Sequence, residues 1–136
     1  MSCSDPKRSV LVVEDHPDTQ SAVAEHLMQC GFEVTVAADG MTAMQLLHET
    51  RPDIVYLDMN LPHISGFDVC EQIRADPELR DMGIMMVSAQ ASINVEAFCL
   101  EAGADAFIGK PFDLEELATV VTRIASRKND RPSEVP

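Results

Sequence analysis

The sequence predicts an α/β domain in which a parallel sheet of five strands is covered by helices on both faces. Short apolar runs rich in Val, Ile and Leu, such as residues 10–13 and 54–57, recur along the chain and are typical of buried parallel strands. Between them lie segments with apolar residues at spacings of three and four, as in helices that pack on a sheet. Strands that alternate with helices favour right-handed crossovers, and therefore a doubly wound sheet.

The expected strands differ in their pattern of burial. The run from 33 to 37 alternates polar and apolar residues, so it is expected at an edge of the sheet. The five expected strands cover residues 9–13, 33–37, 54–57, 82–87 and 106–108. The sheet that fits this alternation is flavodoxin-like, with strand order 2-1-3-4-5.

Helices are expected after each strand. Pro17 suits a first helical turn and Gly31 a helix end, so the first helix is expected from residue 17 to about 30. Asp113 can cap the last helix, whose apolar face continues to Ile124. The other expected helices cover residues 41–49, 66–75 and 93–102.

The chain of 136 residues is long enough for one domain with a single core, which we expect over residues 8–127. Residues 1–7 and 128–136 are expected to be flexible ends, because the sequence from Ser126 onward is polar and contains two prolines. The C-terminal end also fits a linker. A stand-alone protein and a domain of a longer protein both remain open.

The composition argues against two classes of partner. Ten Lys and Arg residues against 23 Asp and Glu give a net charge of -13, which disfavours binding to nucleic acid. No apolar run reaches the roughly 20 residues that a membrane-spanning helix needs, and no signal peptide is visible. We therefore expect a cytoplasmic protein without direct contact to nucleic acid or membrane. None of the four cysteines forms a C-x-x-C pair, which disfavours a zinc ribbon or a thioredoxin motif. Cys30, Cys70 and Cys99 fall in expected helices, where they are expected to pack as small buried residues.

Polar residues stand where the apolar strands are expected to end. They are Glu14 and Asp15 after the first strand, Asp58 after the third, Ser88 after the fourth and Lys110 after the fifth. Ligands of a parallel sheet bind beyond the carboxyl ends of its strands. Carboxylates held close together repel one another, and Mg²⁺ relieves that repulsion through oxygen ligands. An ammonium and a hydroxyl at the same edge can contact a phosphoryl group.

Glycine-rich phosphate loops do not occur in the sequence. Neither G-x-x-x-x-G-K-[ST], G-x-G-x-x-G nor the G-x-S-x-G elbow is present. Nucleotide binding is therefore unsupported, and a phosphate would be held by metal, Lys110 and main-chain donors.

Four short motifs contain these polar residues. They cover residues 12–16, 56–62 with 65–66, 87–89, and 109–112. Together and in this order, they resemble the receiver domain of bacterial two-component response regulators. The resemblance extends over about residues 8–127.

The resemblance implies a phosphoacceptor site. Asp58 would accept the phosphoryl group. Asp15, Asp58 and the main-chain carbonyl of Asn60 would hold Mg²⁺, with Glu14 acting partly through water. Lys110 would contact the phosphoryl group. The family often has Asp at the position of Glu14, and this longer carboxylate is expected to preserve metal binding with altered affinity.

The resemblance also implies a switch. Ser88 would bond the phosphoryl group once it forms, and Phe107 would turn inward as Ser88 moves. Core packing is the plain alternative for Phe107. Asn60 and Gln90, each two residues after a site residue, would adjust the lifetime of the phosphoryl bond.

The implied partners are a sensor histidine kinase or histidine phosphotransfer protein as donor, and a downstream protein as target. The output surface would comprise the fourth helix, the fifth strand and the fifth helix. A monomer or a weak homodimer through the fourth helix is expected. The protein would catalyse only its own phosphorylation and dephosphorylation, and so would not be an enzyme for other substrates.

Two other functions stay open at this point. A metal-dependent phosphatase could use Asp58 as a covalent nucleophile. Such enzymes of the haloacid-dehalogenase type normally carry an acid two residues later, where this chain has Asn60. A passive interaction module would use its acidic residues only for solubility, and predicts no affinity for Mg²⁺.

Overall fold

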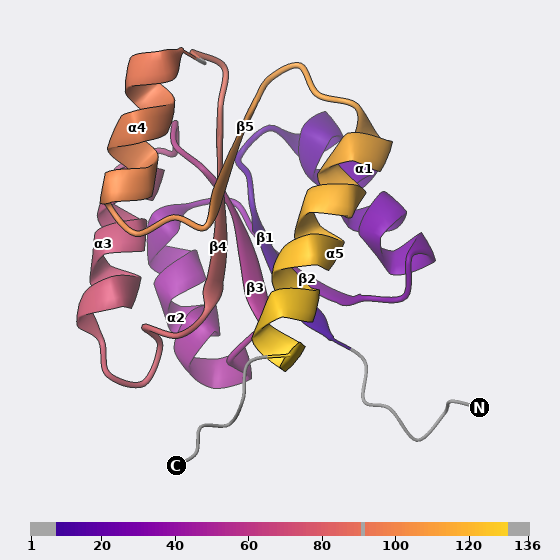
Figure 1. Ribbon diagram of the computed structural model, residues 1–136, viewed down its shortest axis with the longest axis horizontal. Helices are drawn as coiled ribbons and strands as arrows, with labels where there is room; N and C mark the ends of the chain where they lie inside the picture. The colour runs from indigo at the N-terminus through magenta and orange to yellow at the C-terminus, as the bar shows by residue number, and fades with distance from the viewer. Residues whose placement is uncertain (1–7, 91, 131–136) are drawn as a thin grey trace.

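The computed structural model describes residues 8–90 and 92–130, in which strands and helices alternate along the chain (Figure 1). The strands are β1 (Ser9–Val13), β2 (Glu33–Ala37), β3 (Ile54–Asp58), β4 (Gly83–Ser88) and β5 (Ala106–Gly109). The helices are α1 (Pro17–Gln29), α2 (Gly40–Thr50), α3 (Gly66–Ala75), α4 (Ile93–Glu101) and α5 (Leu114–Asp130).

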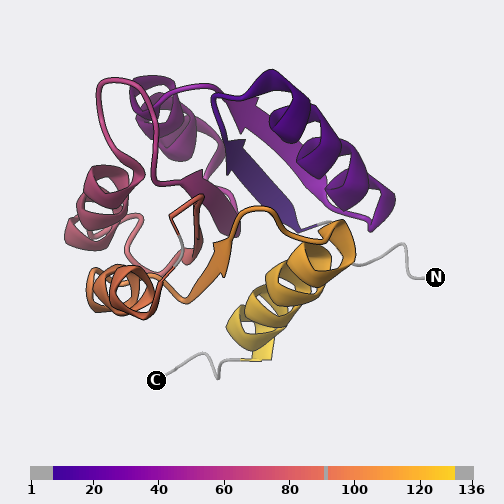
Figure 2. The same cartoon turned by 90° about the horizontal axis from the view of Figure 1, so that it is seen from above.

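The strands form one parallel sheet in the order β2-β1-β3-β4-β5. This confirms the predicted flavodoxin-like fold class and the edge position of β2. Seen from above, α1 and α5 lie on one side of the sheet, and α2, α3 and α4 lie on the other (Figure 2). Both faces of the central strands are therefore covered, which is why β3 and β4 are apolar along almost their whole length.

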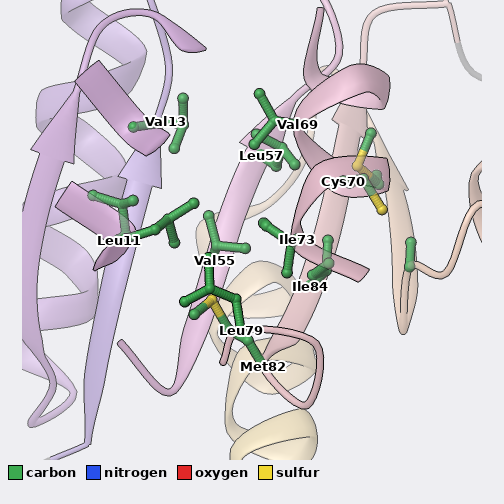
Figure 3. Close-up of a cluster of buried hydrophobic side chains, with 14 of the residues drawn as sticks. Leu11, Val13, Val55, Leu57, Val69, Cys70, Ile73, Leu79, Met82 and Ile84 are labelled. Carbon is green, nitrogen blue, oxygen red and sulfur yellow. The ribbon is translucent and has the colours of Figure 1, made fainter. Parts of the chain in front are cut away.

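Alternate residues of each strand point to opposite faces, so the sheet separates two cores. Leu11, Val55 and Ile84 pack against Leu47 of α2 and Ile73 of α3 (Figure 3). All five side chains have no exposed surface. This core anchors α2, α3 and α4 to the sheet.

The core on the opposite face holds α1 and α5. Val12 of β1 and Tyr56 of β3 pack with Leu27 of α1 and with Leu117 and Val121 of α5. These five side chains are also fully buried. One apolar layer thus positions both α1 and α5 on this face of the sheet.

Side-chain caps begin four of the helices, and Asp113 caps α5 as predicted. The carboxylate of Asp39 accepts from the N–H of Thr42, 2.7 Å away, at the start of α2. Ser65 and Ser92 cap α3 and α4 in the same way. Each cap satisfies an N–H group that has no partner within the helix.

The end of α5 differs from the prediction. The helix continues to Asp130, so residues 128–130, which were expected to belong to the flexible end, are helical. The end of the helix contains Arg and Lys, which are good helix formers, and the first proline that stops a helix is Pro132. The expected flexible ends at 1–7 and 131–136 lie outside the described residues.

A burial expectation also fails at Cys30. It was expected to pack as a small buried residue, like Cys70 and Cys99, but it is exposed. Cys30 follows the last turn of α1, where its N–H caps the helix and its side chain faces away from the core.

Among the described residues, none of the helices has the length and apolar character required to cross a bilayer.

Candidate functional site

The register of the sheet brings the carboxyl ends of four strands together at one end of the sheet. Val13 pairs with Leu57, and Asp58 pairs with Val87 in the next strand. The residues that follow β1, end β3 and β4, and follow β5 therefore meet there, as predicted for Glu14, Asp58, Ser88 and Lys110.

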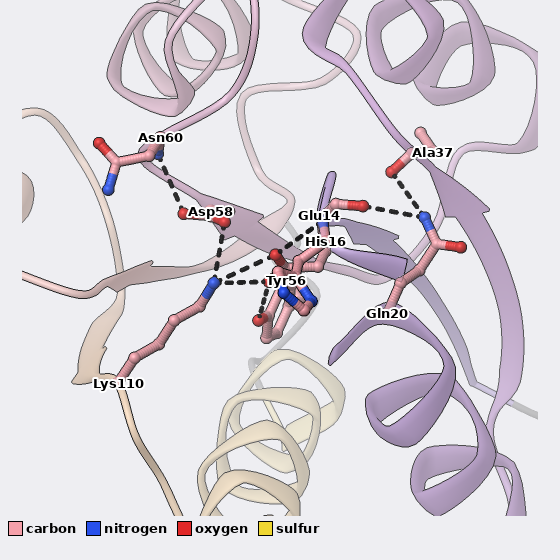
Figure 4. A network of polar contacts seen from close by, with 8 residues as sticks. All are labelled: Glu14, His16, Gln20, Ala37, Tyr56, Asp58, Asn60 and Lys110. Carbon is pink, nitrogen blue, oxygen red and sulfur yellow. Dashed lines mark hydrogen bonds and ion pairs between the residues drawn. The ribbon is translucent and has the colours of Figure 1, made fainter. Parts of the chain in front are cut away.

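Lys110 connects two buried carboxylates at this end of the sheet. Its Nζ lies 3.0 Å from Asp58 Oδ2 and 3.0 Å from Glu14 Oε1 (Figure 4). Glu14 is fully buried and Asp58 is 2% exposed, whereas Lys110 is only half-buried. The pair of acids is therefore balanced by one ammonium that can still reach solvent.

Asp15 completes a group of three acids. Carboxylate oxygens of Glu14, Asp15 and Asp58 lie within 4.8 Å of one another, and Asp15 is exposed. These hard oxygen donors, carried on neighbouring strand ends, match the ligands that Mg²⁺ prefers. The donor set thus fits a magnesium ion.

Asp58 is held at both oxygens. Its Oδ1 accepts from the N–H of Asn60 at 3.0 Å, and its Oδ2 accepts from Lys110. Burial, together with the negative charge of Glu14, raises the pKa of Asp58 to about 6, although the bond from Asn60 opposes this shift. A carboxyl group with this pKa is largely ionised at neutral pH and can act as a nucleophile.

Glu14 shows the opposite balance. Burial alone would raise the pKa of its carboxyl group, but hydrogen bonds from Tyr56 and Lys110 outweigh burial and lower it. The pKa of Lys110 is raised, because bonds to Glu14 and Asp58 outweigh its own burial. At neutral pH the site therefore contains a charged lysine between two carboxylates.

The remaining predicted residues surround this centre. Ser88 is buried at the end of β4, and its hydroxyl accepts from the N–H of Gln90 at 3.0 Å. The N–H of Lys110 donates to the carbonyl of Ser88 at 2.8 Å, which joins the ends of β4 and β5. Phe107, on β5, is half-buried and packs against the core beneath α2, α3 and α4.

The analysis of the sequence missed Tyr56 as a polar member of the site. Its hydroxyl donates to Glu14 Oε1 at 2.6 Å (Figure 4). Strand periodicity contained a usable signal, because Glu14 follows Val12 by two residues and Val12 pairs with Tyr56. Both side chains therefore belong on the same face of neighbouring strands.

Two further residues support the site from neighbouring elements. Gln20 of α1 donates through Nε2 to the carbonyl of Glu14 at 2.9 Å, which ties α1 to the end of β1. A Cβ atom at Gly66, the first residue of α3, would overlap the carbonyl oxygen of Asp58. Only glycine fits there, because α3 begins directly against the backbone at the end of β3.

The family model of the response regulator receiver domain matches residues 10–122. The chain belongs to the response regulator receiver family. This confirms the resemblance seen in the four motifs, and the chain is thereby a receiver domain of two-component signalling.

Relatives show the same relationship at moderate identity. The chain is 34% identical over 122 residues to the "DNA-binding dual master transcriptional regulator RpaA" of Synechocystis sp., covering 90% of this chain and 50% of the relative. It is 36% identical over 129 residues to the "DNA-binding response regulator MtrA" of Mycolicibacterium smegmatis, covering 95% and 55%. The chain thus spans about half the length of these relatives.

A solved structure shows a similar fold with a metal. It is the receiver domain of the sensor histidine kinase PA1611 from Pseudomonas aeruginosa, which has a magnesium ion coordinated in its active site cleft. The TM-score is 0.81 at 30% identity, with 89% of this chain and 99% of that one covered.

One expectation about partners is wrong. The acidic composition was taken to exclude direct binding to nucleic acid, yet RpaA and MtrA are both named as DNA-binding regulators. Net charge was a poor guide, because it describes only this chain, which spans about half of each relative.

Proposed function

We propose that this receiver domain is the phosphoacceptor of a two-component phosphorelay, in which Asp58 takes a phosphoryl group from a phosphohistidine. The observation that carries the proposal is the buried carboxylate of Asp58 at a strand end, 3.0 Å from Lys110 and beside two further acids. A receiver domain that is related in structure holds a magnesium ion in its cleft.

In the proposed reaction a carboxylate oxygen of Asp58 attacks the phosphorus atom. The P–N bond of the phosphohistidine breaks, and its electron pair returns to the imidazole nitrogen. Lys110 neutralises charge that gathers on the phosphoryl oxygens, and the N–H of Asn60 keeps the carboxylate in one orientation. Because Lys110 already contacts Asp58, little reorganisation precedes the transfer.

The metal ligands in this proposal are Asp15, Asp58, the main-chain carbonyl of Asn60 and, partly through water, Glu14. Bound Mg²⁺ would supply positive charge to the phosphoryl oxygens. The ionised state of Glu14, stabilised by Tyr56 and Lys110, suits a residue with this role.

The proposed switch follows from the new charge on Asp58. A phosphoryl group adds about two negative charges and three strong acceptors. Ser88 and Lys110 would turn to bond these oxygens, and the connected ends of β4 and β5 would move with them. Phe107 would then turn inward and alter the surface of α4, β5 and α5, while Asn60 and Gln90 would adjust the lifetime of the modification.

Intact mass after incubation with Mg²⁺ and acetyl phosphate tests this proposal on the wild-type protein and on Asp58→Asn. We expect a mass increase of one phosphoryl group on the wild type alone, because the amide cannot attack phosphorus. An adduct on Asp58→Asn would contradict the assignment of the acceptor.

The same samples separate the other two functions. Steady release of product from p-nitrophenyl phosphate would favour a metal-dependent phosphatase. A wild-type protein with neither an adduct nor affinity for Mg²⁺ would favour a passive interaction module.

A further inference from the structure

Tyr56 presents a buried hydroxyl that contacts none of the atoms that react in the proposed transfer. The residue lies in the middle of β3, two positions before Asp58, and has no exposed surface. Its ring packs edge-on against Phe112, with the ring centroids 6.3 Å apart at 74°. An apolar side chain would fill this place without any hydrogen-bonding requirement, whereas a buried hydroxyl must find a partner.

The partner of that hydroxyl is Glu14. Tyr56 donates to Oε1 at 2.6 Å, and Lys110 Nζ lies 3.0 Å from the same oxygen. The other oxygen, Oε2, accepts from the N–H of His16 at 3.2 Å and from Lys110 at 3.1 Å. Both oxygens of a fully buried carboxylate are thus bound, and Tyr56 is the only neutral side chain among these three donors.

The position of Lys110 depends on this arrangement. Its ammonium lies at equal distances, 3.0 Å, from Glu14 Oε1 and Asp58 Oδ2. Rotation of Glu14 would break one of the two buried ion pairs that hold the ammonium between the acids, and breaking a buried ion pair is costly. The hydroxyl of Tyr56 restricts that rotation from the core side of the sheet.

We infer that Tyr56 is a positioning residue, whose hydroxyl fixes Glu14 so that this carboxylate keeps Lys110 beside Asp58 and stays among the cation ligands. The role of Tyr56 in phosphoryl transfer rests on the proposed function. Its tests, however, measure cation affinity and the tyrosine itself, and need no phosphoryl transfer.

A double-mutant cycle tests the route through Glu14. The proteins are the wild type, Tyr56→Phe, Glu14→Gln and the double variant, and calorimetry measures the Kd for Mg²⁺. Tyr56→Phe should raise the Kd about tenfold, the usual effect of losing a group that orients a metal ligand. In the Glu14→Gln background the same change should alter the Kd less than about twofold, because coupled residues are not additive.

Phe112→Leu provides the matched control. It removes the ring that packs on Tyr56 but keeps the hydroxyl, so its Kd should stay within about twofold of the wild-type value. Circular dichroism verifies that each variant is folded. A wild-type Kd for Tyr56→Phe, an equal effect in both backgrounds, or an equal effect of Phe112→Leu would each overturn the inference.

The tyrosine spectrum offers a second, independent readout. Tyr56 is the only tyrosine of the chain, and there is no tryptophan, so the near-ultraviolet tyrosine absorption reports this residue alone. A phenol that donates to a charged carboxylate absorbs at longer wavelength than one that donates to an amide. Glu14→Gln should therefore shift the tyrosine band to shorter wavelength, and an unchanged band would overturn the inference.

The outcomes separate the inference from the proposed function. A higher Kd for Tyr56→Phe than for the wild type, with no phosphoryl adduct on the wild type, would reject the proposed function and retain the positioning role. A normal adduct on the wild type, with equal Kd values for the wild type and Tyr56→Phe, would retain the proposed function and reject the positioning role. A wild-type protein that binds no Mg²⁺ would overturn the inference whatever the mass experiment shows.

Discussion

Asp58 illustrates how neighbours set the chemistry of a single residue. Burial and the charge of Glu14 raise its pKa, while the N–H of Asn60 and the ammonium of Lys110 oppose that rise. An isolated aspartate at the surface would have the ordinary value of about 3.9. The same side chain, placed at the end of β3, therefore changes its protonation much closer to physiological pH.

This shift predicts a pH dependence of cation binding. Because a metal ligand must be deprotonated, and the pKa of Asp58 is raised to about 6, the affinity for Mg²⁺ should be constant above that pH. Below it, the affinity should fall by about tenfold for each pH unit. Glu14 does not cause this loss, because its pKa is lowered and it remains ionised there.

Calorimetric titrations with Mg²⁺ over this pH range measure the effect. The control is Asp58→Asn, which should bind more weakly and lack the step near pH 6, since its amide does not titrate. A wild-type profile that stays flat down to about pH 5 would contradict the role of Asp58 as a ligand.

At the scale of elements, Arg74 joins three segments of the chain. From α3 its Nε donates to the carbonyl of Gly103 at 2.8 Å, and its Nη1 donates to the carbonyls of Arg80 and Met82 at 2.7 and 2.6 Å. Its Nη2 donates to Asp105 at 3.1 Å. One guanidinium thus holds α3, the segment before β4 and the loop between α4 and β5 in place.

Arg74→Lys should therefore be nearly as harmful as Arg74→Ala. An ammonium has no planar fork with which to reach three carbonyls in different directions. The free energy of unfolding should fall by about 1–3 kcal/mol for either variant, because several acceptors lose their donor. Urea denaturation measures this change.

Arg80→Lys provides the control, since Arg80 is an exposed arginine of the segment that Arg74 holds. Its effect should lie within about 0.5 kcal/mol, as for most surface substitutions. Stability equal to the wild type in Arg74→Lys would show that charge alone, without the fork, is sufficient.

At the scale of the whole molecule, two cores share one sheet. Leu47 of α2 belongs to the core on one face, and Leu117 of α5 belongs to the core on the other. Both side chains have no exposed surface. Because β1, β3 and β4 contribute to both cores, loss of packing on one face should weaken the other.

Leu47→Ala and Leu117→Ala should each lower the free energy of unfolding by about 2–5 kcal/mol, the range for a leucine removed from a core. Each should still unfold in a single cooperative transition. Circular dichroism follows the helices during urea denaturation, and the absorption of Tyr56 follows the core beneath α1 and α5. Transitions that do not coincide would contradict the cooperativity.

Leu100→Ala is the matched control for this pair. Leu100 lies on α4 and is 43% exposed. Its removal leaves no enclosed cavity, so the loss should stay below about 1 kcal/mol.

The sequence by itself determined the sheet, the strand order and the acids at the strand ends. These depend on local patterns: apolar runs such as 54–57 have no polar face, and Asp58 follows one of them directly. The end of the last helix was less predictable. The polar segment that ends α5 has no core contact pattern, and polar composition alone does not distinguish a solvent-facing helix from a disordered tail.

Only the tertiary structure decided which side chains of the site form hydrogen bonds and ion pairs with one another. The bond between Tyr56 and Glu14 joins residues 42 positions apart, and Lys110 reaches Glu14 across 96 positions. The sequence placed Arg74 in a predicted helix. Its carbonyl partners lie in other segments, which only the fold brings close to it. Hydrogen bonds and pKa shifts depend on distance and burial in space, and neither quantity is contained in the local sequence.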